Sequence, residues 1–217
     1  MARARKASRE MLGLSRGEFA VLQRLRTPEK AQQFLYDLKQ NFERKGETCN
    51  SVRTVLKERR AHCIEGAMVA ACALWIHGEP PLLLDLQAVG DVDHVVTLFR
   101  RRGCWGAISK TNGIGLRWRD PVHRTLRELA MTYLHEYFNK RERITLRTFS
   151  LPYDLRRMAP SEWVTSEDAW DLVDNLEAMR HFKLMTPAQI RGLTRRDPFE
   201  QVVGELVQYR RPPKKKK

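Results

Sequence analysis

The sequence predicts an α+β fold in which a buried helix packs on a small antiparallel sheet and further helices follow towards the C-terminus. Three observations support this prediction. Residues 64–76 are apolar on nearly every side, which is typical of a helix inside a core. Residues 82–111 hold short aliphatic and alternating segments between breakers, as strands do. Beyond residue 150, Thr186-Pro187 and Asp197-Pro198 each resemble a helix cap followed by proline.

Charge and cysteine content narrow the class of protein. The chain of 217 residues carries 40 Lys and Arg against 26 Asp and Glu, a net charge of +14. Part of the excess lies at the two ends, which can attract anionic partners or stay solvated. Four cysteines without a secretory signal indicate reduced thiols and a cytoplasmic location. No window has the length of a transmembrane helix, so we expect no membrane contact.

Composition divides the chain into four parts. We expect a basic N-terminal arm at 1–26, a core at 27–150, a helical C-terminal extension packed on the core at 151–210, and a disordered lysine tail at 211–217.

Two amphipathic helices are expected before the apolar helix. Thr27-Pro28 is a typical helix start, and residues Ala31, Phe34, Leu35, Leu38 and Phe42 continue at helical spacing to an end near Lys45-Gly46. A second periodic stretch at 51–60 leads to Cys63. The apolar helix then ends at His77-Gly78, because Pro80-Pro81 prevents its continuation. Residues 82–89 follow as a buried strand.

A hairpin is expected next, and its register is open. Residues 94–99 and 104–111 read as its strands. A four-residue loop at 100–103 pairs His94 with Ser109, whereas a two-residue turn at Arg102-Gly103 pairs His94 with Thr111 and leaves Ser109 one diagonal away. A slip by one residue would instead bring Lys110 and Asn112 to His94.

The rest of the chain is expected to be mainly helical. Asp120-Pro121 predicts the start of a helix through Tyr137, and residues 144–149 could form an edge strand. Helices at 169–180 and after Thr186-Pro187 and Asp197-Pro198 complete the prediction.

Cys63, His94 and a nearby polar residue are the candidate catalytic group. A helix N-terminus and a neighbouring imidazole can lower the pKa of a thiol, and the thiolate is the nucleophile. A histidine on a strand can serve as the base, and Ser109 or Asn112 can orient it. If the helix begins earlier, at Ser51 or Thr54, Cys63 loses the helix dipole.

The order of these pieces resembles the transglutaminase-like branch of the papain-like superfamily. The matching segments are Cys63 to Ala67 leading into the small-residue helix, Asp93-His94-Val95 opening a strand, and Gly103-Cys104-Trp105 about ten residues later. The resemblance covers about 60–120. It implies a papain/transglutaminase-like core, with Cys63 attacking an acyl carbon and His94 shuttling the proton.

The sequence departs from the family pattern at the third member of the triad. The family has an acidic residue at the position of Ser109, and a hydroxyl stabilises an imidazolium less than a carboxylate does. Asn112 is the other candidate, since an amide fills this role in papain-like enzymes. Asp93 is adjacent to His94 but points to the opposite face. Val96 replaces the usual aromatic residue after the histidine.

For each of three other residues near these motifs, the sequence is consistent with two alternative roles. Glu65 can face substrate or stabilise the helix N-terminus, Lys110 can contact an anionic substrate or be solvated, and Trp105 can contact substrate or pack under the hairpin. We do not expect His62 to be the base, because neighbouring side chains on a helix diverge by about 100°.

We expect no metal and no cofactor. A zinc site built from residues Cys49, His62, Cys63, His94 and Cys104 lacks the usual ligand spacing. Gly113-Ile114-Gly115 is no dinucleotide fingerprint.

Two functions remain open. The first is a cysteine-dependent acyl-transfer enzyme, a peptidase, amidase or transamidase with a peptide or amide substrate, in which the N–H of Cys63 contributes to an oxyanion hole. The second is a catalytically degenerate domain that binds an acidic protein or nucleic acid through its basic segments.

Overall fold

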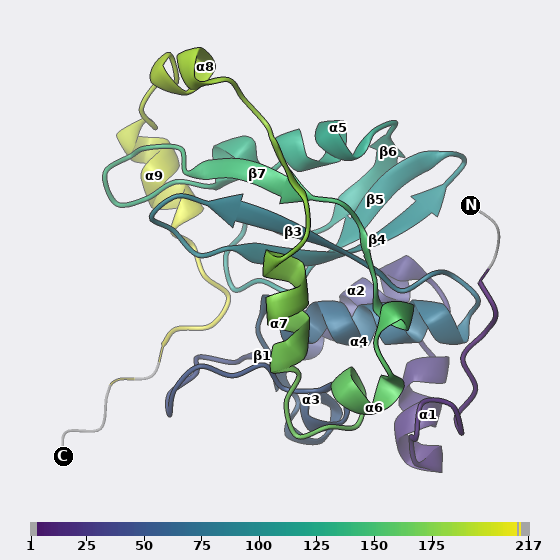
Figure 1. The fold of residues 1–217 in the computed structure, drawn as a ribbon. Helices are drawn as coiled ribbons and strands as arrows, with labels where there is room; N and C mark the ends of the chain where they lie inside the picture. The colour runs from purple at the N-terminus through teal and green to yellow at the C-terminus, as the bar shows by residue number, and fades with distance from the viewer. Residues whose placement is uncertain (1–3, 212, 214–217) are drawn as a thin grey trace.

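The computed structural model describes residues 4–211 and 213 as a mixed α+β protein with a mainly antiparallel sheet, which confirms the predicted class (Figure 1). The strands of the main sheet lie in the order β6-β5-β4-β3-β7-β9, and β8 also pairs with β3. Their bounds are β3 (Leu82–Ala88), β4 (His94–Arg101), β5 (Cys104–Ile108), β6 (Arg119–His123), β7 (Leu146–Ser150), β8 (Tyr153–Asp154) and β9 (His181–Lys183).

Helices cover both faces of this sheet. On one face, α4 (Cys63–Ile76) packs on β4 and contacts α1 (Arg16–Gln23), α2 (Pro28–Asp37) and α3 (Val52–Glu58). The other face carries α5 (Leu126–Met131) and a single 3₁₀ turn, η1 (Leu134–Glu136) (Figure 1). The C-terminal part adds η2 (Leu155–Arg157), α6 (Pro160–Trp163), α7 (Trp170–Glu177), α8 (Pro187–Arg191) and α9 (Pro198–Gly204).

The central helix, α4, is buried along its whole length after Cys63, as its apolar sequence predicts. Its small residues let neighbouring elements approach closely. Gly66 has a specific role here, because a Cβ at this position would lie 2.4 Å from Cβ of Lys110. The segment after β5 therefore rests directly on the first turn of α4, next to Cys63.

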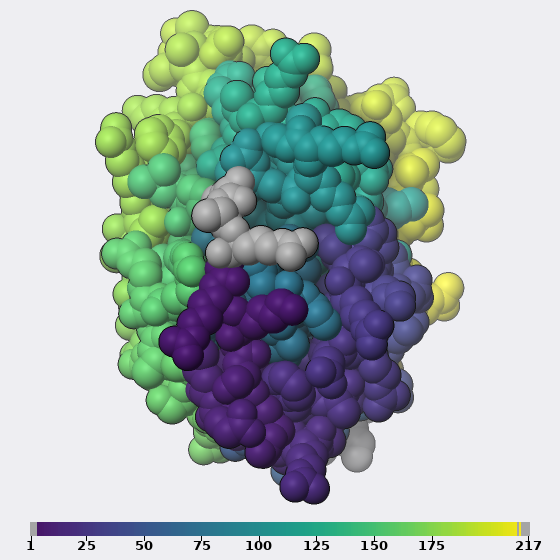
Figure 2. Space-filling model, turned by 90° about the vertical axis from the view of Figure 1, so that its right-hand side faces the viewer, coloured from purple at the N-terminus to yellow at the C-terminus, as the bar shows by residue number. Residues whose placement is uncertain are grey.

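The N-terminal segment is folded against this core. Ala4 N–H donates to the Gly78 carbonyl and Ala7 N–H to that of Trp75, so the segment runs past the end of α4 (Figure 2). Its apolar side chains are buried, namely Ala7, Leu12, Leu14, Leu22 and Leu25. Ser15 and Glu18 form a capping box that starts α1. The basic composition of this segment does not indicate such packing, so the sequence predicts only an arm at 1–26.

The first amphipathic helix is shorter than predicted. It ends at Asp37, and Leu38 is already extended, with φ −75° and ψ 135°. Lys39–Gln40 then forms β1, which pairs in parallel with β2 (Arg60–Ala61). The helical spacing of Leu38 and Phe42 was misleading, because backbone pairing with the strand that precedes Cys63 outweighs local periodicity.

The predicted helix start at Asp120-Pro121 is wrong. These residues lie in β6, at the end of the strand order, where proline is tolerated because no further strand needs its N–H. The helix begins after Thr125, whose side chain accepts a hydrogen bond from Glu128 N–H.

The regular elements described after residue 150 are mainly helices, as predicted, but strands also occur among them. β8 and β9 are short strands in this region. β9 pairs with β7, so β7 lies inside the sheet and is not an edge strand. Segments of two or three residues are too short to show a strand period.

The hairpin has the second of the two predicted registers. Arg101 pairs with Cys104, which leaves a turn of two residues, Arg102-Gly103. Both have positive φ, 49° and 83°, as a type I′ turn requires. The register with a four-residue loop is therefore wrong, because this turn matches the twist of the strands.

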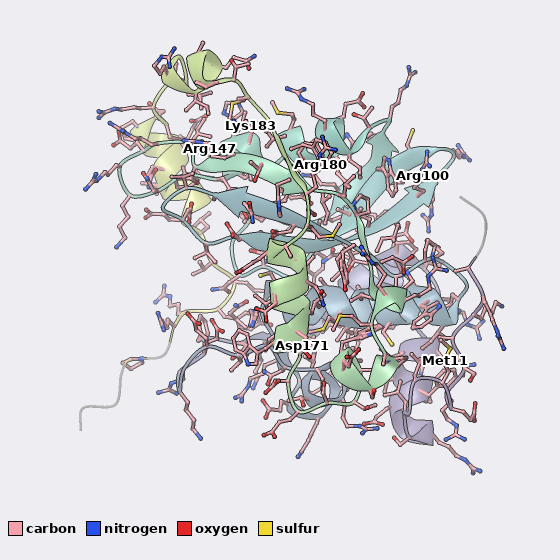
Figure 3. The ribbon with its side chains drawn as sticks, viewed as in Figure 1. Met11, Arg100, Arg147, Asp171, Arg180 and Lys183 are labelled. Carbon is pink, nitrogen blue, oxygen red and sulfur yellow. The ribbon has the colours of Figure 1, made fainter. Side chains whose placement is uncertain are left out.

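Cationic side chains lie at both ends of the main sheet. Figure 3 shows Arg100 near the hairpin turn and Arg147, Arg180 and Lys183 around β7 and β9. The predicted lysine tail at 211–217 lies outside the described residues except for 211 and 213. Among the helices of the described chain, none combines the length and apolar character needed to cross a membrane.

Candidate active site

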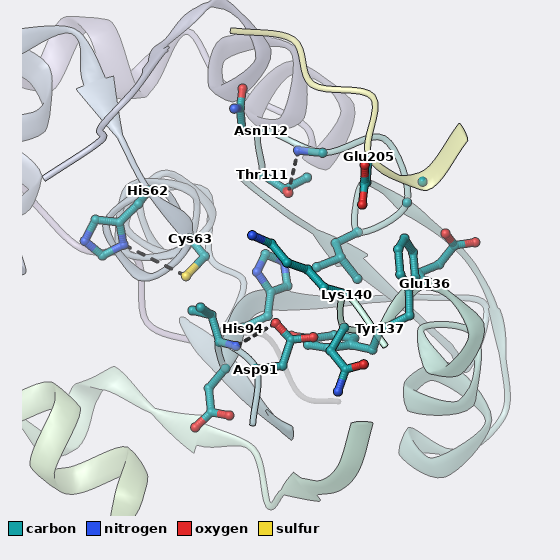
Figure 4. A pocket seen from close by; sticks show the side chains of 18 of the residues that line it. His62, Cys63, Asp91, His94, Thr111, Asn112, Glu136, Tyr137, Lys140 and Glu205 are labelled. Atoms are coloured by element: carbon teal, nitrogen blue, oxygen red, sulfur yellow. Dashed lines mark hydrogen bonds between the residues drawn. The ribbon is translucent and has the colours of Figure 1, made fainter. Parts of the chain in front are cut away.

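A cleft of about 960 Å³ opens at the N-terminus of α4. Cys63, the first residue of α4, and His94, the first residue of β4, both line it. Further walls come from the loop after β3, the segment after β5, η1 with the loop that follows, and α9. Figure 4 shows the sulfur of Cys63 between the imidazole rings of His62 and His94. The predicted cysteine and histidine thus meet in one cavity.

Cys63 lies in an environment that favours the thiolate. Burial would raise the pKa of the sulfur, but hydrogen bonding and positive charge from His62 and His94 outweigh it and hold the pKa of Cys63 well below its usual value. The helix begins at Cys63, so the sulfur also lies at the positive end of the α4 dipole. The nucleophilic form is therefore favoured near neutral pH.

The other cysteines lack this environment. Burial raises the pKa of Cys49 to about 12 and raises that of Cys72 as well. Cys104 is partly exposed on β5, as Cys63 is on α4. It therefore offers a matched thiol for comparison.

His62 is a member of the site that the sequence analysis missed. It is the N-cap of α4 and has an extended backbone, with φ −103° and ψ −167°, so it does not follow helical geometry. Its Nδ1 lies 3.9 Å from Sγ of Cys63. The reason for setting His62 aside, divergence of neighbours on a helix, is therefore wrong.

The ring of His62 is surrounded by acceptors that favour its protonated form. Nε2 donates to the Thr48 carbonyl at 2.8 Å and lies 3.3 Å from a carboxylate oxygen of Glu65. Burial alone would lower the pKa of His62, but Cys63, Glu65 and Thr48 together raise it to about 9. A positive imidazolium therefore sits beside the sulfur below that pH.

Glu65 holds the loop around this imidazolium and does not reach the cleft. Its side chain is fully buried. The carboxylate accepts hydrogen bonds from the side chains of Asn41, Thr48 and Asn50 and from the backbone N–H of Asn50 and His62. Of the two predicted readings, stabilisation of the helix N-terminus fits this geometry and substrate contact does not.

His94 is oriented by Ser109. Nε2 of His94 lies 2.7 Å from Oγ of Ser109, and both residues are buried. The Ser109 hydroxyl donates to the Leu116 carbonyl at 2.5 Å, so its oxygen must accept from Nε2–H of His94. This fixes the neutral tautomer and leaves Nδ1 as the basic nitrogen available to Cys63.

Gln32 of α2 holds Ser109 in place. Its side-chain amide donates to the Ser109 carbonyl and accepts from the Ser109 N–H, both at 2.8 Å. Gln32 is almost fully buried, so these two bonds are shielded from water. No local sequence signal predicts this contact, because 77 residues separate the two positions.

Asn112 has a different partner and does not orient His94. Its side chain accepts from the Tyr209 N–H and donates to the Tyr209 carbonyl, each at 2.9 Å. Its own carbonyl accepts from the Gln208 N–H. Asn112 thus anchors the segment after α9 against the cleft wall, and of the two candidate orienting residues only Ser109 contacts His94.

Lys110 fits neither of its two predicted roles, whereas Trp105 fits the one in which it packs in the core. Lys110 lines the cleft but is buried, and its Nζ donates to the Leu38 carbonyl at 2.6 Å. Burial, with the nearby charge of Arg117, lowers the pKa of Lys110 to about 8. Trp105 belongs to the core under α5 and packs beside Arg100, so it is a core residue and not part of the cleft wall.

In the part of the chain that the structure describes, no group of three or more His, Cys, Asp or Glu side chains is arranged to hold a metal ion. No family model matches the sequence, and a search of curated proteins finds no match.

Proposed function

We propose that this protein is a cysteine-dependent acyl-transfer enzyme of the transglutaminase-like type, acting on a peptide or amide. The observation that carries the proposal is the pair of imidazoles around Cys63 at a helix N-terminus inside a cleft. Such an arrangement supplies a thiolate, a base and an electrostatic partner without further groups.

The reaction begins from the ion pair in which Nδ1 of His94 holds the proton of the Cys63 thiol, and the Cys63 thiolate attacks the acyl carbon. The carbonyl oxygen becomes an oxyanion, which the backbone N–H of Cys63 can stabilise, because the first N–H groups of a helix have no intrahelical partner. When the intermediate collapses, the C–N bond breaks and protonated His94 gives its Nδ1 proton to the leaving amine. A thioester on Cys63 remains.

In the second half of the reaction, neutral His94 acts as the base. Nδ1 removes a proton from a water molecule or an amine, which attacks the thioester and releases the acyl product and the thiolate. Ser109 keeps Nδ1 in the required tautomer. Because Ser109 is neutral, it stabilises the His94 imidazolium less than a carboxylate would.

An activated ester tests the proposal directly. Incubation with p-nitrophenyl acetate at pH 7 is expected to acetylate Cys63 much faster than Cys104, with release of p-nitrophenol. Peptide mapping by mass spectrometry locates the acetyl group. Cys63→Ala should remove the fast reaction and Cys104→Ala should retain it.

If Cys63 is acetylated no faster than Cys104, the proposal is wrong. The non-catalytic binding function would then remain.

A further inference from the structure

Tyr137 carries a buried hydroxyl with no hydrogen-bond partner in the structure. The residue follows η1, is 3% exposed and lines the same cleft as Cys63 and His94. Figure 4 shows it across the cleft from Cys63, on the far side of His94. Leaving such a group unpaired costs about 1–3 kcal/mol, so its position in a cleft points to a ligand that pairs with it.

This hydroxyl is a donor and not a base. Burial raises the pKa of Tyr137, and the negative charges of Cys63, Asp93 and Asp91 raise it further. The O–H bond therefore stays intact across the physiological range. A neutral phenol in the same cleft as a thiolate is suited to donate a hydrogen bond to an oxygen that becomes negative.

Tyr133 shows that an unpaired buried phenol is not by itself evidence for a bound ligand. Its hydroxyl is also without a partner and its side chain is fully buried. It does not line the cleft, and the guanidinium of Arg119 lies 4.2 Å from its ring centre. Tyr133 and Tyr137 thus differ in access to the cleft while sharing burial and chemistry.

We propose that the Tyr137 hydroxyl donates a hydrogen bond to the carbonyl oxygen of the substrate acyl group as that oxygen becomes an oxyanion. This inference rests on the proposed acyl-transfer function. It makes Tyr137 a second donor beside the Cys63 N–H and a catalytic residue, because it touches the reacting carbonyl. It also sets a requirement on the substrate, which must be a carbonyl compound with its acyl oxygen directed towards η1.

Two reactions of Cys63 separate this role from a structural one. Acetylation by p-nitrophenyl acetate passes through an oxyanion, whereas alkylation by iodoacetamide displaces iodide and forms none. Tyr137→Phe removes only the hydroxyl. It is expected to slow acetylation about 100-fold, the usual effect of losing one oxyanion donor, and to leave the alkylation rate unchanged. Tyr133→Phe, the matched control, should change neither rate.

Each outcome bears on a separate claim. If the wild-type protein acetylates faster at Cys63 than at Cys104 but Tyr137→Phe acetylates as wild type, the role of Tyr137 is refuted and the acyl-transfer function stands. Equal losses in both reactions would show that the hydroxyl supports the fold or the thiolate, and would also overturn the inference. If wild-type Cys63 shows no fast acetylation, both proposals fall.

Discussion

His94→Gln is expected to lower the turnover of p-nitrophenyl acetate about 100- to 10,000-fold, the usual contribution of a general acid or base. The reason lies in the second half of the reaction. Water must lose a proton as it attacks the thioester, and Nδ1 of His94 is the nitrogen that the bond to Ser109 leaves free for it. His62 cannot substitute, because its pKa of about 9 keeps it protonated at neutral pH.

The variant should therefore stall as an acyl-enzyme. Intact-protein mass spectrometry is expected to show acetylated Cys63 accumulating in His94→Gln and turning over in the wild type. His135→Gln, an exposed histidine on η1, is the control and should behave as wild type. Wild-type turnover in His94→Gln would exclude His94 as the base.

Glu65→Ala is expected to lower the free energy of unfolding by about 3–5 kcal/mol, the usual cost of removing one member of a buried charge pair. The carboxylate is fully buried and gathers hydrogen bonds from the loop between β1 and α3. Its removal leaves those donors unpaired and leaves the His62 imidazolium without its nearest anion. Urea denaturation at pH 7 measures the loss.

Two further variants serve as comparisons for Glu65→Ala. Glu65→Gln keeps the shape and one acceptor oxygen, so its loss should be smaller. Glu177→Ala on the exposed surface of α7 should stay within about 0.5 kcal/mol of wild type. If Glu65→Ala unfolds at the same urea concentration as Glu177→Ala, the carboxylate does not hold this loop together.

The sequence predicted the elements whose signal is local and strong. The apolar run at 64–76 has no polar face and can only be a buried helix, and the breakers after it mark its end. Thr27, Thr186 and Asp197 each cap a helix with proline at its start. These features depend on neighbouring residues, so one sequence is enough to show them.

Features that depend on distant residues were missed. The pairing of β1 with β2 ends the first helix early, and β9 forms only because β7 offers it an edge. Within the site, Gln32 and the segment at Tyr209 reach their partners across 77 and 97 residues. No hydrophobic periodicity or helix-cap motif in the sequence indicates such contacts.

His62 is the instructive case, because a local signal for it existed. Glu65 lies three positions after His62 and accepts its backbone N–H, as the acidic residue of a capping box does. This spacing marks His62 as an N-cap outside the helix. An N-cap side chain is free to turn towards the first residue of the helix, which here is Cys63.

The central claim is that Cys63 is a thiolate held between His62 and His94, and the pH dependence of its alkylation tests this most directly. The pKa of Cys63 is lowered, so the thiolate should persist as the pH falls below about 8.5, the usual value for cysteine. The pKa of His62 is raised to about 9, so its positive charge is present below that pH and lost above it. Iodoacetamide labelling of Cys63 and Cys104 between pH 4 and 10, at about unit steps, measures the pH midpoint of the labelling rate for each of these two thiols.

We expect Cys63 to label at full rate at about pH 7, with a midpoint well below 8.5 that moves upwards in His62→Gln and in His94→Gln. A Cys63 midpoint equal to that of Cys104, unmoved by either substitution, would contradict the account.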